Sequence, residues 1–590
     1  MWTIFLALSI FCFLTAVLIS VAVNRKKQLQ VQAINCFNIL FAGVYLSAFL
    51  AFLPTHVGGS DRSVFGCIKV AFLSFFNAIQ VFTAGADFEN VTNSLAQCDG
   101  LVNIAYQVWV AFLFVMAPIF TFGFVLSLFK NASSYFKYFG VYYRDIFVFS
   151  ELNEKSLALA GDIKAKHPKA AIVFTDVFED NEENIYEMME QAKDIGAICF
   201  KKDILVVNFH RHAARKSVSF FTIGNNETEN LNQALKLIAR YKNRENTRLY
   251  IFSTMLDSEL LLTAVDKGKM KVRRINEVQS LISRILYERG HIIFDGAHNN
   301  GNTKTISAVV VGLGNYGTEM LKTLSWYGQM DGYRLKINAF DKDSLAEEKF
   351  CARAPELMDA TYNGAEIAGT ANYHIAIHSG MDVKTLSFAK EIRKITDATY
   401  VFVALGNDDE NISTAVMLRT YFERMGLHPA IHAVVKNAQQ SKALEGIVNF
   451  RKQPYDVEFV GDIDSSFTEA VIIDHELEDE GLAIHMKWGE EEEFWTYEYN
   501  YRSSIASAIH MKARIHCGIP GAGKKEEDLT DEEKDIIAGL EHRRWNAYMR
   551  SEGYVHGDAR NDLAKVHHNL TDYSKLDGVS KHKTQSVGTK

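Results

Sequence analysis

The pattern of apolar and polar positions divides the chain into a first part suited to lipid and a longer part suited to water. Within the first 130 of 590 residues, three long apolar stretches follow one another. They run from Trp2 to Val23, from Phe37 to Leu53 and from Leu101 to Phe129, and the third contains no Asp, Glu, Lys or Arg. Because a helix needs roughly 20 apolar residues to cross the hydrocarbon core of a bilayer, this pattern predicts three transmembrane helices.

The charges that flank these stretches predict how the spans are oriented. Basic residues follow the first and last spans, whereas the segment between the second and third spans ends in acidic residues. The basic residues are Arg25, Lys26, Lys27, Lys130, Lys137 and Arg144, and the acidic ones are Asp87, Glu89 and Asp99. Basic flanks favour the cytoplasmic side of a membrane. We therefore expect a multi-pass protein of the inner membrane of a bacterial cell, with its N-terminus outside and its C-terminal domains in the cytoplasm.

A fourth apolar stretch, from Val64 to Phe82, conflicts with that orientation, because a fourth crossing would move the soluble part to the other side. We therefore expect Ser74 to Phe82 to form a short re-entrant helix that enters the membrane and returns. Small residues follow this helix and would let backbone carbonyls line a water-filled path. They are Thr83, Ala84, Gly85, Ala86 and Asp87.

This segment resembles the pore helix and filter of tetrameric potassium channels, with Thr83 to Asp87 standing where TVGYGD would stand. The resemblance implies a path for ions. One residue and one glycine of the filter are missing, so potassium selectivity does not follow from it. The alternative is an amphipathic helix on the membrane surface followed by an ordinary loop.

After the membrane part, short β-branched apolar runs alternate with helical segments, which is typical of a parallel sheet with helical crossovers. The first set of runs is Ile146–Phe149, Ala171–Phe174, Val218–Ile223 and Leu249–Phe252, and the second is Ala308–Val311, Leu335–Phe340, Tyr400–Leu405 and Ile431–Val435. The third run of each set is followed by a similar marker, Gly224-Asn225 with Glu229-Asn230 and Gly406-Asn407 with Glu410-Asn411. The repeat predicts two Rossmann-like domains in tandem.

The predicted fold is an α-helical transmembrane domain, with three spans and a re-entrant pore helix, followed by two α/β Rossmann-like domains and a small, mainly helical C-terminal module. The expected boundaries are 1–130 for the transmembrane domain, 131–144 for a linker, 145–270 for the first Rossmann-like domain, 271–304 for a connector, 305–455 for the second Rossmann-like domain, 456–576 for the C-terminal module with its lead-in, and 577–590 for a polar tail.

The second Rossmann-like domain carries residues typical of a nucleotide site. Gly312, Gly314 and Gly317 directly follow a strand and precede a helix, with the spacing G-x-G-x-x-G. Such glycines allow a tight turn and close approach of the backbone to a phosphate, and Asp341, 24 residues past Gly317, is placed to accept ribose hydroxyls. The remaining candidates are Asn315, Gly406 and Asn407. This set predicts an adenine nucleotide or an NAD-like ligand.

The equivalent turn of the first domain runs from Ser150 to Ser156, with two carboxylates and no glycine, so we expect it to be structural or to bind something other than a dinucleotide. Together the two domains, roughly residues 145 to 450, resemble the TrkA-N/RCK family of gating domains of potassium channels and transporters. The resemblance implies a homo-oligomer, such as a tetramer, in which ligand binding pulls on the inner helix. No catalytic acid, base or nucleophile set accompanies the fold, so the sequence predicts no enzyme, with an oxidoreductase as the weaker alternative.

The C-terminal module contains four short motifs, Leu540-Glu-His-Arg-Arg-Trp545, Gly553 to Asp562, His567-His-Asn-Leu570 and Tyr573-Ser-Lys-Leu576. They resemble the RyR domain first seen in ryanodine receptors, although Tyr554 and His568 stand where that family prefers Trp and Pro. A stacking ring beside hydrogen-bonding and anion-binding groups suits a nucleotide. The candidate ligand residues are Glu541, His542, Trp545, Tyr554, Arg560 and His567. The alternative places Trp545 and His567 in the core of a small helical domain.

Composition argues against several other classes of site. A net charge of −8 argues against nucleic acid as a partner. The seven cysteines show no CxxC or Cys/His ligand spacing, so we expect no metal site. Cys67 and Cys98 share the outer loop and form either a disulfide or two free thiols. Gly518 to Lys525 imitates a P-loop, but it lacks the Ser or Thr for magnesium, so we expect a solvated loop.

These observations predict an oligomeric membrane channel, or a membrane-disrupting effector, that is gated by a nucleotide second messenger. The architecture resembles the effector end of bacterial nucleotide-signalling antiviral systems. The first alternative is a housekeeping potassium channel or transport regulator gated by NAD or ATP. The second is a non-conducting membrane receptor or scaffold.

Overall fold

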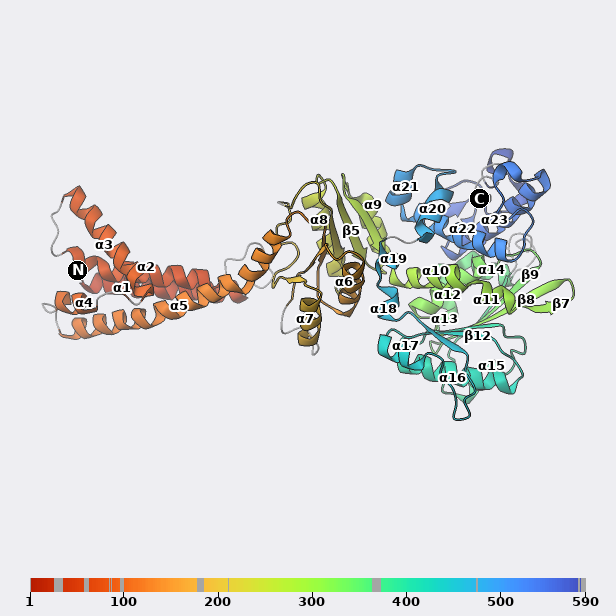
Figure 1. Ribbon diagram of the computed structural model, residues 1–590, viewed down its shortest axis with the longest axis horizontal. Helices are drawn as coiled ribbons and strands as arrows, with labels where there is room; N and C mark the ends of the chain where they lie inside the picture. Colours follow the sequence, from red (N-terminus) through yellow and green to blue (C-terminus); the bar gives the residue numbers. More distant parts are fainter. Residues whose placement is uncertain are drawn as a thin grey trace. The chain divides into compact units, whose positions relative to one another are not determined.

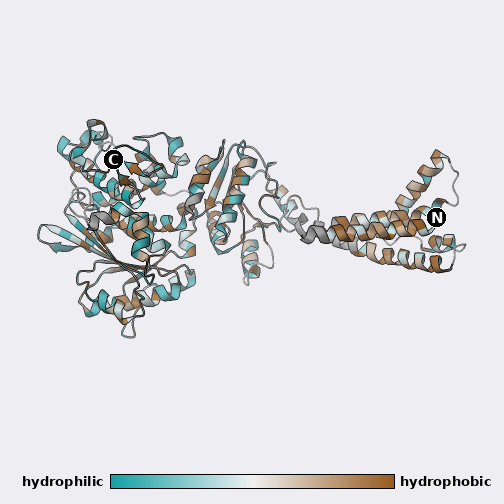
Figure 2. Cartoon of the chain, turned by 180° about the vertical axis from the view of Figure 1, so that it is seen from behind, coloured by the Kyte–Doolittle hydropathy of each residue, from teal (hydrophilic) through white to brown (hydrophobic). Residues whose placement is uncertain are grey.

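The computed structural model describes residues 2–25, 36–57, 63–83, 85, 88–95, 100–177, 185–210, 212–362, 373–473, 476–581 and 584. The chain forms two compact units, an N-terminal unit (Met1–Tyr142) and a C-terminal unit (Tyr143–Lys590) (Figure 1). The helices of the N-terminal unit are predominantly apolar, whereas apolar and polar residues are mixed through the C-terminal unit (Figure 2).

Within its described residues, the N-terminal unit consists of helices. They are α1 (Trp2–Arg25), α2 (Cys36–Val57), α3 (Val64–Phe82), α4 (Phe88–Leu95) and α5 (Gly100–Gly140). Four of them, α1, α2, α3 and α5, are long and apolar enough to cross a membrane. The helix expected from Ser74 to Phe82 begins ten residues earlier, at Val64, where Ser63 Oγ accepts a hydrogen bond from Gly66 N at 3.1 Å, and it is continuous to Phe82.

Small and hydroxyl-bearing residues hold α1 against α2. A Cβ added to Gly43 would lie 2.2 Å from Ala16 Cβ, so the two helices approach closely at this point. Ser9 and Ser47 exchange hydrogen bonds, each hydroxyl donating to the other's carbonyl at 2.7 and 3.0 Å, and Trp109 Nε1 donates to Ser9 Oγ at 2.8 Å. Small residues and satisfied hydroxyls are typical of helix contacts inside a bilayer.

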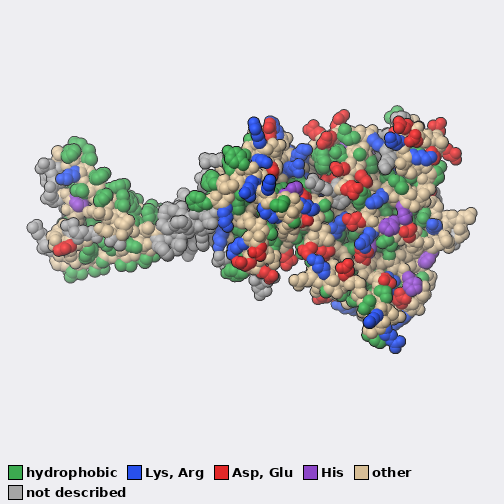
Figure 3. All heavy atoms as spheres, viewed as in Figure 1, with side chains coloured by type: hydrophobic (Ala, Val, Ile, Leu, Met, Phe, Trp, Pro, Cys, Tyr) green, Lys and Arg blue, Asp and Glu red, His purple; other side chains and the backbone are tan. Residues whose placement is uncertain are grey.

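The side of α3 that faces away from its neighbours is apolar. Val64, Phe65, Ile68 and Phe72 are 61 to 80% exposed, and on the visible face of this unit apolar side chains far outnumber charged ones (Figure 3). Charged side chains of both signs are dispersed over the visible face of the C-terminal unit (Figure 3). An apolar exterior of this kind suits contact with lipid.

Helix α5 is much longer than one crossing requires. Its 41 residues correspond to a length of about 60 Å, roughly twice the hydrocarbon thickness of a bilayer. The helix continues through most of residues 131–144, where a separate linker was expected, and ends at Gly140. The first strand of the C-terminal unit begins at Ile146, so only a short connection follows the helix.

The first sheet of the C-terminal unit has six parallel strands in the order β3-β2-β1-β4-β5-β6. They are β1 (Ile146–Phe149), β2 (Ala171–Phe174), β3 (Ile198–Cys199), β4 (Val218–Thr222), β5 (Thr247–Phe252) and β6 (Lys271–Ile275). The connecting helices are α6 (Glu154–Lys166), α7 (Ile185–Asp194), α8 (Glu227–Tyr241) and α9 (Leu256–Ala264). This strand order is that of a Rossmann fold.

The second sheet repeats the order, as β10-β9-β8-β11-β12-β13, with β7 added antiparallel to β8. Its strands are β7 (His298–Asn300), β8 (Thr303–Val311), β9 (Tyr333–Phe340), β10 (Tyr373–His378), β11 (Tyr400–Val403), β12 (Ala430–Val434) and β13 (Val457–Val460). The helices are α10 (Glu277–Arg289), α11 (His291–Asp295), α12 (Asn315–Tyr327), α13 (Ala346–Arg353), α14 (Pro355–Tyr362), α15 (Leu386–Ile392), α16 (Asp408–Arg424) and α17 (Ala438–Leu444). The prediction of two Rossmann-like folds in tandem is confirmed.

The two sheets extend beyond the boundaries expected from the sequence. Strand β6 lies past residue 270, β8 begins before residue 305, and β13 lies past residue 455. The outermost strands of both sheets, β3, β6, β10 and β13, were not among the predicted apolar runs.

The repeated Gly-Asn markers have a structural role. In the first domain, Asn230 Oδ1 accepts from Gly224 N at 2.7 Å and Asn230 Nδ2 donates to the carbonyl of Phe252 at 3.0 Å. In the second, Asn411 Oδ1 accepts from Leu405 N at 2.6 Å and Nδ2 donates to the carbonyl of Val434 at 2.7 Å. Each buried asparagine therefore ties together the ends of two neighbouring strands.

The chain after β13 divides between the two folds. Its elements are α18 (Ile463–Ser466), α19 (Glu469–Ile472), α20 (Glu476–His485), α21 (Glu491–Thr496), α22 (Glu498–His516), η1 (Glu526–Asp528), α23 (Asp531–Ser551), β14 (Val555–His556), β15 (Val566–His567) and η2 (Tyr573–Lys575). Phe467 and Ile472 join the core of the first sheet, whereas Ile505 and Leu540 join that of the second. The C-terminal helices therefore share a hydrophobic core with the second Rossmann fold.

Candidate functional site

The glycine turn of the second domain lies between β8 and α12. Gly312 has φ +89°, and a Cβ there would lie 2.4 Å from the carbonyl oxygen of Ala404. A Cβ on Gly317 would lie 1.7 Å from the carbonyl oxygen of Gly312. These two glycines are required by packing, whereas a Cβ on Gly314 meets no atom within 4 Å. Only Gly314 therefore leaves room for a ligand at the turn.

The polar groups around this turn are engaged with one another. Asp341 accepts hydrogen bonds from the backbone N–H of Leu313 at 2.5 Å and of Asp343 at 2.7 Å. Asn315 is the exposed first residue of α12. A ribose would have to share the Asp341 carboxylate with these backbone donors, so nucleotide binding here stays a prediction.

The other two candidates of this set shape the next strand end. Gly406 has φ +89°, in the left-handed region that favours glycine. Asn407 caps α16, its side chain accepting a hydrogen bond from Glu410 N at 3.1 Å. Both residues have local structural roles.

The equivalent turn of the first domain is closed by its own side chains. Asn153 Oδ1 accepts from Ser156 N at 2.9 Å, and Ser156 Oγ accepts from Asn153 N at the same distance. Asn153 Nδ2 also donates to the carbonyl of Ile223 at 2.8 Å. This capping box fills the place of a glycine turn, which supports the structural interpretation of this segment.

A cavity of about 350 Å³ lies among α20, α22, α23 and the C-terminal loops. It brings together five of the six residues that the sequence indicated, namely Glu541, His542, Trp545, Arg560 and His567. The sixth, Tyr554, is not among the described lining residues, and its ring lies 6.5 Å from that of Tyr499. A volume of this size is at the lower end of the range for small-molecule sites.

One wall of the cavity is aromatic. The rings of His542 and Trp545 stack, with their centroids 5.7 Å apart, and His567 meets Trp545 edge-on at 5.0 Å. Burial, and then the nearby Arg560, lowers the pKa of His567 to about 4. His567 is therefore neutral at neutral pH. Trp545 is half-buried, so part of its ring is available to a ligand.

The floor of the cavity is polar and ionic. Glu541 accepts hydrogen bonds from Arg544 Nη2 at 2.8 Å, Arg514 Nη2 at 3.0 Å and Ser507 Oγ at 3.2 Å. Burial alone would raise the pKa of Glu541, but the two guanidinium groups outweigh it and hold the pKa below its ordinary value. Glu541 therefore orders the floor and is already occupied.

Several lining residues were missed by sequence reasoning, because they lie on α22. This helix contributes Tyr499, Ser503, Ser504 and Ser507 to the cavity. The spacing of the serines, at i, i+1 and i+4, places them on one helical face. That serine-rich face was the available signal, but nothing in the sequence shows that it faces α23.

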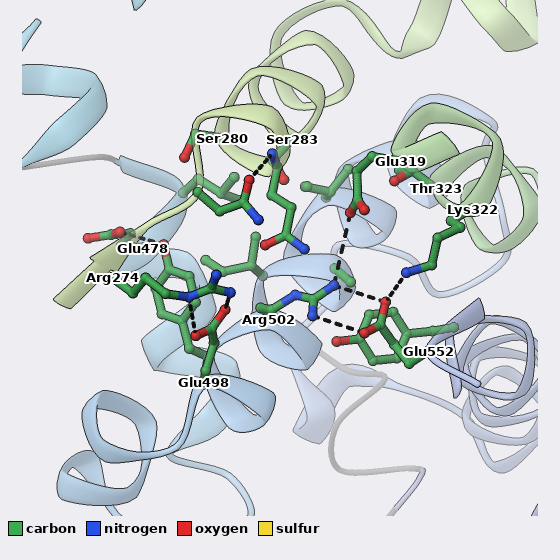
Figure 4. Close-up of a pocket in the computed structure, with 18 of the residues that line it drawn as sticks. Arg274, Ser280, Ser283, Glu319, Lys322, Thr323, Glu478, Glu498, Arg502 and Glu552 are labelled. Atoms are coloured by element: carbon green, nitrogen blue, oxygen red, sulfur yellow. Dashed lines mark hydrogen bonds and ion pairs between the residues drawn. The ribbon is translucent and has the colours of Figure 1, made fainter. Parts of the chain in front are cut away.

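A second cluster, which we call the junction, surrounds a smaller cavity of about 90 Å³ (Figure 4). Arg274 of β6 forms a bidentate pair with Glu498 of α22. Arg502 of α22 binds both carboxylate oxygens of Glu552 at 2.9 Å, and Lys322 of α12 binds Glu552 at 2.8 Å (Figure 4). These ion pairs fasten the first sheet, the second fold and the C-terminal helices to one another.

The predicted pore segment is described only in part. Thr83 follows α3, with its hydroxyl donating to the carbonyl of Gln80 at 3.0 Å. Gly85 is exposed. Ala84, Ala86 and Asp87 lie outside the described residues.

Other sequence features also find local explanations. Cys67 is a free, exposed thiol, and Cys98 lies outside the described residues. Lys524 of the P-loop-like segment pairs with Glu533 at 2.6 Å. Among the described residues, no group of three or more His, Cys, Asp or Glu side chains is arranged to hold a metal ion.

Comparisons with known proteins add nothing to the fold assignment, which rests on the strand order. No protein-family model matches the chain, and no curated protein matches it. One similar solved structure is a dipicolinate synthase polypeptide from Bacillus halodurans, with 10% identity and a TM-score of 0.17 over 48% of this chain and 88% of that one. Another is a dipicolinate synthase polypeptide from Bacillus subtilis, with 11% identity and a TM-score of 0.17 over 48% and 86%. TM-scores this low carry no argument about activity.

Proposed function

We propose that this protein senses a nucleotide in its C-terminal cavity and responds by opening an ion path through the membrane or by disrupting the membrane. The cavity carries the proposal, because a stacking wall formed by Trp545 and His542 beside buried guanidinium groups suits the base and phosphate of a nucleotide. Four helices of membrane-spanning length on the same chain supply the part that responds.

The family resemblances support a sensory role by analogy of architecture. RCK-like domains imply a homo-oligomer, such as a tetramer, and a RyR-like module joined to them implies the effector of a bacterial nucleotide-signalling antiviral system. In this proposal the N-terminal unit lies in the inner membrane and the C-terminal unit in the cytoplasm. The glycine turn at Gly312 would take an adenine nucleotide or an NAD-like ligand as a second input.

The long α5 helix supports mechanical transmission. It remains helical to Gly140, and β1 follows at Ile146. A continuous helix transmits displacement better than a flexible linker does. The junction would pass changes at the C-terminal helices to the first sheet through the Arg274–Glu498 pair.

A second candidate function is a non-conducting receptor or scaffold. The continuous α3 helix favours it, because a helix from Val64 to Phe82 is long enough to cross the membrane and is not the short pore helix that a potassium channel requires. The same observation weakens the case for a housekeeping potassium channel.

Electrical recording on the full-length protein in planar bilayers tests the proposal. We expect AMP, ATP or NAD to evoke a current in the wild-type protein, and Trp545→Ala to abolish the response while the protein still inserts. If none of the three ligands evokes a current or leakage of liposome contents, the receptor or scaffold function is favoured instead.

Topology is tested separately with reporter fusions. A reporter fused after Gly100 is expected on the outer side of the inner membrane, because α5 would then cross to the cytoplasm, where the C-terminal unit is proposed to lie. A reporter at the N-terminus determines the role of α3: it maps outside if α3 returns to the same side, and in the cytoplasm if α3 crosses. A cytoplasmic result at Gly100 would contradict the proposed orientation of the C-terminal unit.

A further inference from the structure

The floor of the C-terminal cavity holds more positive than negative charge. Arg514 and Arg544 share the carboxylate of Glu541, at 3.0 and 2.8 Å, and all three side chains are at most 3% exposed. Arg544 lines the cavity and Arg514 lies behind Glu541, so two guanidinium groups share this one carboxylate. Glu541 is also the one Asp or Glu among the described residues that line the cavity. A buried excess charge is unfavourable unless a counter-ion accompanies it.

Two buried donors in the same cavity have no hydrogen-bond partner within the described part of the chain. They are Arg544 Nη1 and Ser504 Oγ, on side chains that are 1% and 2% exposed. The rings of Trp326 and Tyr548 lie 5.9 and 5.7 Å from the Arg544 guanidinium, which offers it π faces and no negative charge. A water molecule would satisfy the serine hydroxyl but would not neutralise the arginine. The missing partner is therefore an anion.

The same two arginines affect the pKa of the neighbouring His510. Burial first, and then Arg514 and Arg544, lower its pKa well below the ordinary value. His510 Nε2 lies 2.8 Å from the carbonyl oxygen of Gln329, to which the neutral ring donates. The histidine thus remains uncharged beside the two arginines and adds no further cation.

We infer that the cavity floor is a phosphate-binding site in which Arg544 and Ser504 hold the phosphate of the ligand whose base stacks on Trp545. This inference rests on the proposed nucleotide-sensing function and names the part of the ligand that is read. A phosphate accepts several hydrogen bonds at once and so satisfies both donors. A nucleoside without phosphate leaves both unpaired and is rejected.

This inference assigns anion binding to Arg544 on the cavity floor and not to Arg560. Arg560, the partner expected from the sequence, is 53% exposed and is already paired with Asp562 at 3.0 Å. An exposed, paired arginine adds little to anion binding. Arg544 is enclosed, and its Nη1 has no hydrogen-bond partner among the residues that the structure describes, so it is the stronger anchor.

Inorganic phosphate is the probe, and the thermal unfolding of the full-length protein in detergent is the readout. We expect phosphate to raise the melting temperature of the wild type by roughly 2 °C or more over sodium chloride of equal ionic strength. Arg544→Met should abolish this rise, and it leaves Glu541 paired with Arg514. Arg560→Met is the matched control and should keep the rise. No rise in the wild type, a rise retained in Arg544→Met, or an equal loss in Arg560→Met overturns the inference.

Two further arms keep the test decisive. If Arg544→Met does not fold, Ser504→Ala removes one donor and should reduce the rise by at least half, and an unchanged rise counts against the site. Sodium acetate at equal ionic strength should stabilise less than phosphate, and equal stabilisation overturns the assignment to phosphate.

The failure of this inference is distinguishable from failure of the proposed function. Phosphate stabilisation should persist in Trp545→Ala, because the stacking ring is not part of the floor. If phosphate stabilises the protein but no nucleotide evokes a response, the phosphate site is supported and the proposed sensory function is contradicted. If Arg544→Met still responds to a nucleotide, the proposed sensory function is supported and the phosphate site is contradicted.

Discussion

At the glycine turn, the polar groups that would serve a nucleotide bind one another, whereas in the C-terminal cavity two of them have no hydrogen-bond partner among the described residues. Asp341 holds the backbone N–H groups of Leu313 and Asp343. In the cavity, Arg544 Nη1 and Ser504 Oγ are buried without hydrogen bonds in the described part of the chain. A ligand at the turn must compete with an existing network, but a ligand in the cavity completes one. The cavity is therefore the more strongly prepared of the two sites.

The two sites are nevertheless connected through the junction. Helix α12 begins at the glycine turn and carries Lys322, and α23 lines the cavity and leads into Glu552. The Lys322 ammonium lies 2.8 Å from the Glu552 carboxylate. The Lys322–Glu552 ion pair therefore joins the helix that begins at the glycine turn to the helix that lines the cavity.

The largest expected effect is the loss of that connection. Glu552→Gln leaves Arg502 and Lys322, whose side chains are 15% and 19% exposed, without their shared counter-charge, so we expect a loss of about 3–5 kcal/mol in the free energy of unfolding. Arg502 and Lys322 hold the pKa of Glu552 far below its ordinary value in spite of burial, so the contribution is present at neutral pH and is lost as the pH falls. Urea unfolding measures the loss.

Glu319→Gln is the control for this substitution, since Glu319 lies at 4.0 Å from Arg502 and makes the weaker contact. Equal stability of the two variants would contradict the role of Glu552. In a folded Glu552→Gln protein, nucleotide binding at the two sites should become independent.

Trp545→Ala tests the cavity side of the comparison. Loss of a stacking ring should weaken nucleotide binding by about 1–3 kcal/mol, or roughly 5- to 150-fold in affinity, as measured by calorimetry. Because Trp545 is only half-buried, its removal should cost less stability than Trp326→Ala, which removes a ring that is 6% exposed and should cost about 3–5 kcal/mol. A Trp545→Ala protein as unstable as Trp326→Ala, with normal affinity, would assign Trp545 to the core.

Substitutions at the glycine turn test the second of the two candidate nucleotide sites. Gly317→Ala should destabilise the protein by about 1–3 kcal/mol or more, since its Cβ would meet the carbonyl of Gly312. Gly314→Leu meets no such obstacle and should change stability by only about 0.5 kcal/mol. If the turn binds an adenine nucleotide, Gly314→Leu lowers the affinity that remains in the Trp545→Ala background. Unchanged affinity would leave the turn as packing alone.

The smallest effect is a pH dependence confined to the cavity. The folded pKa of His567 is about 4, below its ordinary value of 6.5, so the unfolded chain binds more protons between these two pH values. Stability contributed by neutral His567 is therefore complete above pH 6.5 and is lost as the pH falls towards 4. His567→Gln should remove this part of the pH profile. An identical profile in the variant would show that another group titrates.

The strands illustrate how far local pattern reaches. All eight apolar runs proved to be strands, because a strand buried on both faces of a parallel sheet is recognisable as a continuous apolar run. The strands that the pattern missed include the two outermost strands of each sheet. Lys271–Ile275 and Val457–Val460 carry charged residues within the strand, as expected where one face or edge is open to solvent.

The candidate site shows the same limit. Glu541, His542 and Trp545 share a face of one helix, and helical spacing alone brings them together. The sequence places Arg544 on the same helix, but it does not show that Arg544 Nη1 has no hydrogen-bond partner among the described residues. Ser504 belongs to a different helix, and its place opposite α23 depends on how α22 packs.

The sequence by itself determined the apolar helices of membrane-spanning length, the tandem Rossmann folds and the helical face that carries Trp545, because each depends on the residue pattern within one segment. The tertiary structure decided that α3 is continuous from Val64, that the C-terminal helices share the core of the second fold, and that two arginines share one glutamate. Those features depend on which segments meet, and a charge or a hydroxyl is left without a partner only in relation to its neighbours in space. Periodicity reports whether a face is buried, and the packing of distant segments determines what it is buried against.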